Sequence, residues 1–205
     1  MALTSYINPF TVSQGIAAGG GDSPRINNYR VGATGTYYAG DVVITAAGGT
    51  VTAPTAVAAT DAAYIAGVVA AKTVTTATTD TIPVYDALPG VVFSGHIVGD
   101  ATACIATTAV ASDMLGLSLG LVKVTNLATL GGTATAYALS TGITTAASGA
   151  CVRTVAFAKQ QYWGTNTVVA DPFSPPAILS PRINFVFSKT WWTTGVAGGT
   201  YATAS

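Results

Sequence analysis

The sequence contains very few charged side chains and no glutamate. Of its 205 residues, 8 are Lys or Arg and 8 are acidic, and every acid is an aspartate. Charged residues make up 8% of the chain, against about 25% in ordinary globular domains. Helices of soluble proteins depend on Glu, Lys, Leu and Arg, so this shortage argues against a helical fold. It also leaves no basic stripe for nucleic acid and no basic face for a membrane surface, and we expect neither as a partner.

Long hydrophobic runs are also missing. The chain is 50% hydrophobic and its mean hydropathy is +0.51, yet it has no apolar run of about 18 residues. The nearest candidate, residues 55–71, is interrupted by Asp61 and several threonines. Residues 1–10 lack the basic and apolar segments of a secretory signal, so we expect none. A monomer with so few charges would expose a large apolar surface, and we therefore expect self-association, as a homotrimer.

Residues that carry catalysis are scarce. His96 is the only histidine, and it shares an expected strand face with Ser94. The sequence around Ser94 lacks the G-x-S-x-G pattern of a nucleophile elbow, so we expect His96 in a core or an interface. Cys104 and Cys151 have no C-x-x-C spacing. We expect them to be buried apolar residues, with a disulfide as the less favoured alternative.

Metal and cofactor sites are not indicated either. The aspartates stand singly, which excludes an Asp-rich calcium loop. His96 and Asp100 would lie about 13 Å apart on one strand, too far for a shared ion. The glycines at 19–21 do not follow an expected strand, so they do not form a phosphate-binding loop. We therefore expect no catalytic residue, no metal, no cofactor and no enzymatic activity.

The residues that are abundant predict strands and turns, most clearly over residues 37–98. Runs of Val, Ile, Thr and Tyr are separated there by Gly, Pro and Asp. Residues 41–46 and 50–54 form one expected hairpin, because the glycine pair Gly48-Gly49 permits positive φ at both central positions. Residues 81–86 and 90–98 form a second expected hairpin around Pro89 and Gly90.

Two further details of this stretch carry structural expectations. Pro83 lacks a backbone donor, which places its strand at an edge or makes Pro83 a strand start. Residues 91–98 are mostly apolar on both faces, as in a strand that is buried on both sides or lies against a partner.

A second β module is expected over residues 111–165. Within 114–124, Leu117, Leu119 and Leu121 alternate on one face. Further strands are expected at 133–139 and 151–159. The predicted fold is all-β, with small antiparallel β-barrel or sandwich modules and extended N- and C-terminal arms. The expected organisation is an arm at 1–36, modules at 37–110 and 111–165, and a Pro-rich arm at 166–205.

The arms lack regular periodicity except at one C-terminal strand. Residues 1–36 predict an arm that is either disordered or laid across a neighbouring subunit. The prolines of 171–181 force an extended path toward the strand 182–188. That strand should dock at the edge of a β module, in its own subunit or in a neighbouring one. Its apolar face and the two tryptophans that follow are the candidate assembly residues: Ile183, Phe185, Phe187, Trp191 and Trp192.

The order of the turns and strands resembles a known family. The segments are GDVV at 40–43, IAGVV at 65–69 and IPVYDALPGVVFSG at 82–95, with downstream segments at 113–124 and 152–157. This run, over about residues 37–159, resembles the capsid decoration, or cement, proteins of tailed bacteriophages. The missing glutamates and the Pro-rich C-terminal arm depart from the family pattern and leave the mode of shell attachment open.

The resemblance implies a structural, non-enzymatic virion protein. Such a protein is made in the host cytoplasm and binds the major capsid protein on the outer surface of the icosahedral head. The alternative is a receptor- or glycan-binding head-fibre or spike domain, in which Tyr162-Trp163 or Trp191-Trp192 could form a sugar platform. Aromatic pairs near the end of a β protein more often anchor a core or an interface. A secreted surface-layer protein and an enzyme rank below these two.

Overall fold

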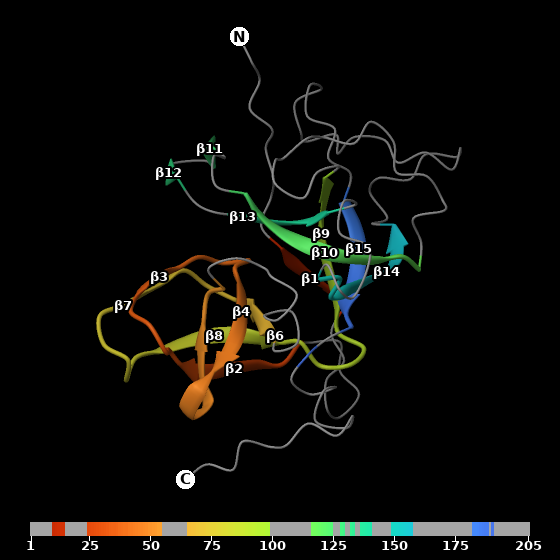
Figure 1. Cartoon of the computed structure of the whole chain (residues 1–205). Helices are drawn as coiled ribbons and strands as arrows, with labels where there is room; N and C mark the ends of the chain where they lie inside the picture. The colour runs from red at the N-terminus through yellow and green to blue at the C-terminus, as the bar shows by residue number, and fades with distance from the viewer. Residues whose placement is uncertain are drawn as a thin grey trace.

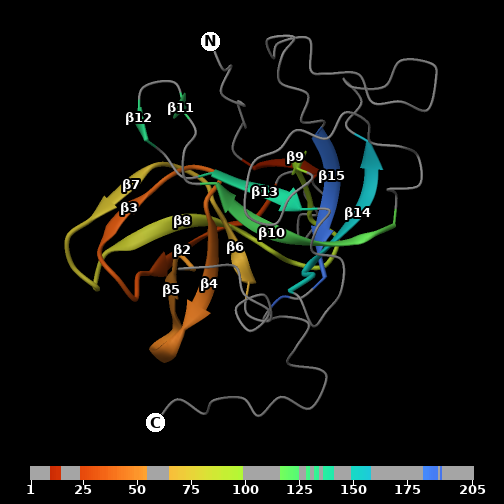
Figure 2. The same cartoon turned by 45° about the horizontal axis from the view of Figure 1, so that its top comes forward.

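The protein is an all-β sandwich of mostly antiparallel sheets, and the all-β class is the one that the sequence predicts (Figure 1). The computed structural model describes residues 10–14, 24–54, 65–98, 116–124, 128–129, 132–133, 136–140, 149–157, 182–188 and 190. Among these residues the only helical turn is a short 3-10 turn, Ala47–Gly49. The strands gather into two main sheets, which the views in Figures 1 and 2 show side by side.

The first main sheet has five strands in the order β2-β8-β6-β4-β5. Their bounds are β2 (Ile26–Arg30), β8 (Thr81–Asp86), β6 (Ile65–Val69), β4 (Val42–Ala46) and β5 (Thr50–Thr52). An isolated bridge between Val31 and Val51 brings the two outer strands together, so the sheet is strongly curved. Beside it lies a two-stranded sheet of β3 (Gly35–Tyr37) and β7 (Thr73–Thr75).

The first expected hairpin is confirmed. Strands β4 and β5 pair antiparallel, with Ile44 opposite Thr52 and Ala46 opposite Thr50. Gly48 and Gly49 occupy the turn with φ of 72° and 71°, in the left-handed region that glycine adopts without steric cost.

The expected edge position of Pro83 is wrong, because β8 lies between β2 and β6. The Pro83 carbonyl accepts a hydrogen bond from the Ala70 amide at 2.8 Å. The nitrogen and carbonyl of one strand residue point to the same side. The missing donor of Pro83 therefore faces Ala70, just beyond the last residue of β6, where it removes no bond from the ladder.

The second main sheet has six strands in the order β1-β9-β13-β10-β14-β15. Their bounds are β1 (Thr11–Gln14), β9 (Val92–Val98), β13 (Ala136–Ser140), β10 (Ser118–Val124), β14 (Val152–Phe157) and β15 (Arg182–Phe187). A further pairing of β15 with β9 curls this sheet back on itself. A separate small ribbon pairs β11 (Ala128–Thr129) with β12 (Gly132–Thr133).

The second expected hairpin is wrong, although its turn is correctly placed. Gly90 has a φ of 90° and the Val91 amide bonds to the Leu88 carbonyl at 3.1 Å. The strands on either side do not pair with each other, since β8 joins the first sheet and β9 the second. The turn is therefore the crossing point between the two sheets.

The N-terminal segment is not simply an arm. Strand β1 pairs with β9, β2 pairs with β8, and Phe10 and Val31 are buried. The sheets consequently divide the chain differently from the expected ranges. Residues 26–86 supply the first main sheet, whereas β1 joins strands from 92 onward in the second.

Two hydrophobic cores account for the apolar strands. The larger core lies between the main sheets and includes Val42 and Val68 from the first and Phe93 and Leu119 from the second. The smaller core lies on the other face of the first sheet and includes Val43 and neighbours on β6 and β8. Strand β6 is buried at all of its residues. Strands with both faces buried require apolar residues at successive positions, so much of the hydrophobic content is used within one chain.

Candidate functional site

The predicted C-terminal strand does dock, but as an interior strand. Strand β15 pairs with β14 on one side and β9 on the other. Ile183 and Phe185 are fully buried and Phe187 is 7% exposed. These three side chains therefore lie in the core of their own chain, so the strand docks in its own subunit, which is one of the two alternatives that the sequence leaves open. Their role in assembly stays a prediction. Trp191 and Trp192 lie outside the described residues. Thr190, directly before them, bridges to Ile65, the first residue of β6.

An aromatic cluster explains why this strand is interior. The ring centroids of Phe185 lie 5.1 Å from Phe10, 6.0 Å from Phe93 and 5.4 Å from Phe187. Phe93 and Phe187 form a fourth pair in the same cluster. Three of the four pairs have the edge-to-face geometry that aromatic rings prefer, and the exception is the stacked pair of Phe93 and Phe185. The cluster joins the first, middle and last described parts of the chain. It is a packing centre rather than a surface.

Both residues of the candidate catalytic pair lie in β9. Ser94 is 6% exposed within β9. His96 stands opposite Arg182 in the β9–β15 register, and its side chain lies outside the described residues. Cys151 is fully buried, as expected, whereas Cys104, Asp100, Tyr162 and Trp163 lie outside the described residues.

One buried polar cluster surrounds Asp86 at the end of β8. Its carboxylate accepts hydrogen bonds from Asn27 Nδ2 at 2.5 Å and Tyr29 Oη at 2.7 Å. Arg25 Nε lies 3.5 Å from Asp86 Oδ2 in an ion pair whose acidic side chain is wholly buried. Burial raises the pKa of Asp86 more than these partners lower it. Burial, followed by the hydrogen bond to Asp86, raises the pKa of Tyr29 to about 12. The cluster anchors edge strand β2 to β8.

A second polar cluster lies at the junction of the two main sheets. Asp41 precedes β4 of the first sheet and is 6% exposed. Lys123 and Tyr137 are a cross-strand pair on β10 and β13 of the second sheet. Both interact electrostatically with Asp41. Tyr137 is 1% exposed, and its hydroxyl has no hydrogen-bond partner among the described residues. We refer to Asp41, Lys123 and Tyr137 as the junction cluster.

Burial dominates the electrostatics of the junction cluster. It raises the pKa of Asp41 from 3.8 to about 6, against the lowering effects of the Tyr38 amide and the Lys123 charge. It also raises the pKa of Tyr137, to which the negative charge of Asp41 adds. The group that titrates nearest to neutral pH in this cluster is therefore a carboxylate between two sheets.

Sequence reasoning missed both buried carboxylates. Asp41 and Asp86 each adjoin a run of apolar strand residues, in GDVV and VYDAL. An aspartate within such a run is the sequence feature that could have predicted a buried carboxylate. When a strand is apolar on both faces it is buried on both sides, and a carboxylate next to it is buried with it. Their partners come from distant segments, and the sequence contains no pattern that pairs them.

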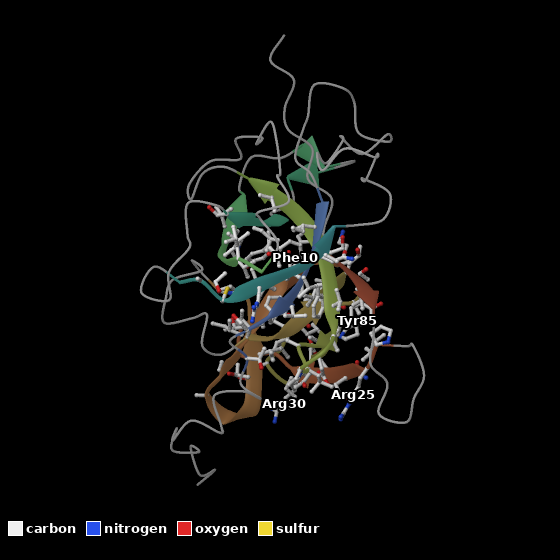
Figure 3. The ribbon with its side chains drawn as sticks, turned by 90° about the vertical axis from the view of Figure 1, so that its right-hand side faces the viewer. Phe10, Arg25, Arg30 and Tyr85 are labelled. Carbon is white, nitrogen blue, oxygen red and sulfur yellow. The ribbon has the colours of Figure 1, made fainter. Side chains whose placement is uncertain are left out.

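The outward face of β2 is the clearest mixed surface in the described part of the chain. Ile26, Asn28 and Arg30 are exposed and alternate with half-buried residues. Ile26 is 50% exposed and stands opposite Tyr85, which packs against the larger core. Figure 3 shows Arg25 and Arg30 extending from this edge below Tyr85. The other exposed large apolar side chains are Val74, Leu117 and Val155.

The described residues show neither a metal-binding cluster nor a membrane-spanning helix. They contain no group of three or more His, Cys, Asp or Glu side chains that could hold a metal ion. None of their helices has the length and apolar character needed to span a membrane.

Comparison with known proteins identifies no relative: no protein-family model, no curated protein and no solved structure matches this chain.

Proposed function

We propose that the protein is a structural virion protein, a capsid decoration protein of a tailed bacteriophage. It would bind the major capsid protein on the outer surface of the head and stabilise contacts between capsomers. The observation that carries the proposal is that the GDVV–IAGVV–IPVYDALPGVVFSG run, which resembles the decoration proteins, forms the central strands of the fold. That run supplies β4, β6, β8 and the start of β9, so it contributes to both main sheets and both cores.

The glycines of this run meet backbone requirements. Gly40 and Gly90 have φ of 89° and 90°, and Gly67 lies against the backbone of Tyr85. The run that resembles the decoration proteins therefore specifies a β scaffold. A scaffold whose role depends on its outer surface is consistent with a protein added to a shell.

The direct test is co-sedimentation of the purified protein with undecorated phage heads. We expect saturable binding to the heads, and no binding to host cells or to immobilised glycans. Binding to cells or glycans without binding to heads would instead favour the receptor-binding alternative, and would contradict the proposal.

The structure offers a variant for the same assay. Ile26 is exposed and stands opposite the half-buried Tyr85 across the β2–β8 pair, and exposed apolar side chains of this kind are used in protein contacts. We expect Ile26→Asp to weaken head binding roughly tenfold or more. Val74→Asp is the matched control, because Val74 is 64% exposed on the separate two-stranded sheet. Equal binding by the wild type and Ile26→Asp would exclude this face from the contact.

The expected homotrimer is tested separately by light scattering. The chain has a mass of 20.4 kDa, so a trimer corresponds to roughly three times that mass. A single species with the mass of one chain, at micromolar concentration, would contradict self-association.

A further inference from the structure

The backbone around Asp41 is held firmly in the first main sheet. The Asp41 amide bonds to the Tyr38 carbonyl at 3.0 Å, and its carbonyl accepts from the Val69 amide at 2.8 Å. Its carboxylate accepts a hydrogen bond from the Tyr38 amide at 2.8 Å. The next residue, Val42, packs into the core between the sheets. The carboxylate is thus fixed at the point where the first sheet meets the second.

The groups that face Asp41 come from two strands of the other sheet and from its own turn. On β10 and β13, the Lys123 ammonium lies 5.9 Å from the centroid of the Tyr137 ring. Tyr38 lies in the same turn as Asp41, and the centroid of its ring is 5.4 Å from the ammonium of Lys72. Among the described residues, Asp41 forms no ion pair. The carboxylate therefore interacts electrostatically with a buried phenol, Tyr137, and with the ammonium of Lys123, with which it forms no ion pair among the described residues.

We propose that Asp41 is a pH-sensitive latch between the two main sheets. With a neutral carboxyl group, the sheets close over Asp41 and Tyr137. With an ionised carboxylate, the buried charge draws in Lys123 and water, and the junction loosens. The orphan hydroxyl of Tyr137 supports this second state, because water that enters the junction would satisfy it as well as the carboxylate. The inference does not depend on the proposed role in the virion.

The direction of the pH dependence follows from the burial of Asp41. Its pKa is about 6 in the folded chain against an ordinary value of 3.8, so the folded state binds more protons between these two values. The closed junction is therefore most stable at acid pH, below the pKa of Asp41 in the unfolded chain. This stabilisation is lost as the pH rises toward and through the pKa of Asp41 in the folded chain. From pH 5 to pH 7.5, the equilibrium constant for local opening of the junction should rise roughly tenfold.

The experiment measures hydrogen exchange of backbone amides by NMR at pH 5 and pH 7.5, corrected for the intrinsic effect of pH. We expect the protection of Val122, Lys123 and Tyr137 to fall roughly tenfold more than that of Ile82 and Val84 in the smaller core. Asp41→Asn keeps an acceptor for the Tyr38 amide and cannot ionise, so it should abolish this difference. Asp80→Asn is the control, because backbone hydrogen bonds from Thr76 and Ala77 lower the pKa of Asp80 and move its titration out of the window.

Two results would overturn the latch. One is a junction that keeps its pH dependence in Asp41→Asn, and the other is an equal loss of protection in both cores. If Asp41→Asn does not fold, the carboxyl carbon of Asp41 is titrated in the wild type instead. A midpoint near the ordinary value would overturn the proposal, whereas a midpoint near 6, accompanied by the fall in junction protection, would support it.

Discussion

Replacing Gly67 by alanine should destabilise the protein by about 3 kcal/mol or more. Gly67 lies in β6 between β4 and β8, opposite Val43 and Asp86. A Cβ atom there would overlap the carbonyl oxygen of Tyr85 and lie 2.7 Å from Val84 Cγ1. A backbone carbonyl cannot rotate away as the end of a side chain can. The added methyl group would therefore force β6 and β8 apart in the middle of the sheet.

Urea unfolding followed by circular dichroism measures this effect. Gly48→Ala is the matched control, because a Cβ at Gly48 meets no atom within 4 Å but the residue has a φ of +72°. That variant should lose only about 1–2 kcal/mol, the cost of a left-handed conformation in a residue with a side chain. Equal losses in the two variants would show that the steric contact at Gly67 is not important.

Replacing Phe185 by alanine should cost about 3–5 kcal/mol of unfolding free energy. The ring is fully buried and contacts Phe10, Phe93 and Phe187. Its removal leaves a cavity where β1, β9 and β15 meet, and each of these strands comes from a different part of the sequence. We therefore expect the second main sheet to lose stability before the first. Hydrogen exchange should show this order, with Ile97 and Leu119 losing protection before Ile82.

Val155→Ala provides the comparison for this variant. Val155 lies on the neighbouring strand β14 and is 43% exposed, so its truncation should change the unfolding free energy by only about 0.5 kcal/mol. A loss in Phe185→Ala as small as in Val155→Ala would contradict the interior position of β15. Such a result would restore the edge docking predicted from the sequence.

Much of the local structure could be predicted because it follows from local chemistry. The glycine pair at 48–49 turns the chain between β4 and β5. Gly90 makes a turn where it was expected. Leu119 and Leu121 share a buried face, as their alternation predicts, whereas Leu117, before the strand begins, is 40% exposed. These features depend on the φ angles, side-chain shape and period of a few adjacent residues.

The partners of the strands could not be predicted in the same way. The sequence predicts a hairpin at the turn after β8, although this turn leads into the other sheet. The hydrogen bonds between strands join backbone groups that are nearly the same at every residue. The sequence of a strand therefore does not specify which strand it pairs with. The choice depends on which side chains fill the shared core. Here that choice placed β15 between β14 and β9.

The sequence by itself therefore determined the all-β class, the turns and the scarcity of charge, because each is set by composition and by neighbouring residues. Only the tertiary structure decided that Asp41 and Asp86 are buried and that Asp41 meets Lys123 and Tyr137 across two sheets. The electrostatic effect of a carboxylate depends on its distance from water and from other charges. Those distances exist only after segments at least 57 residues apart have packed together.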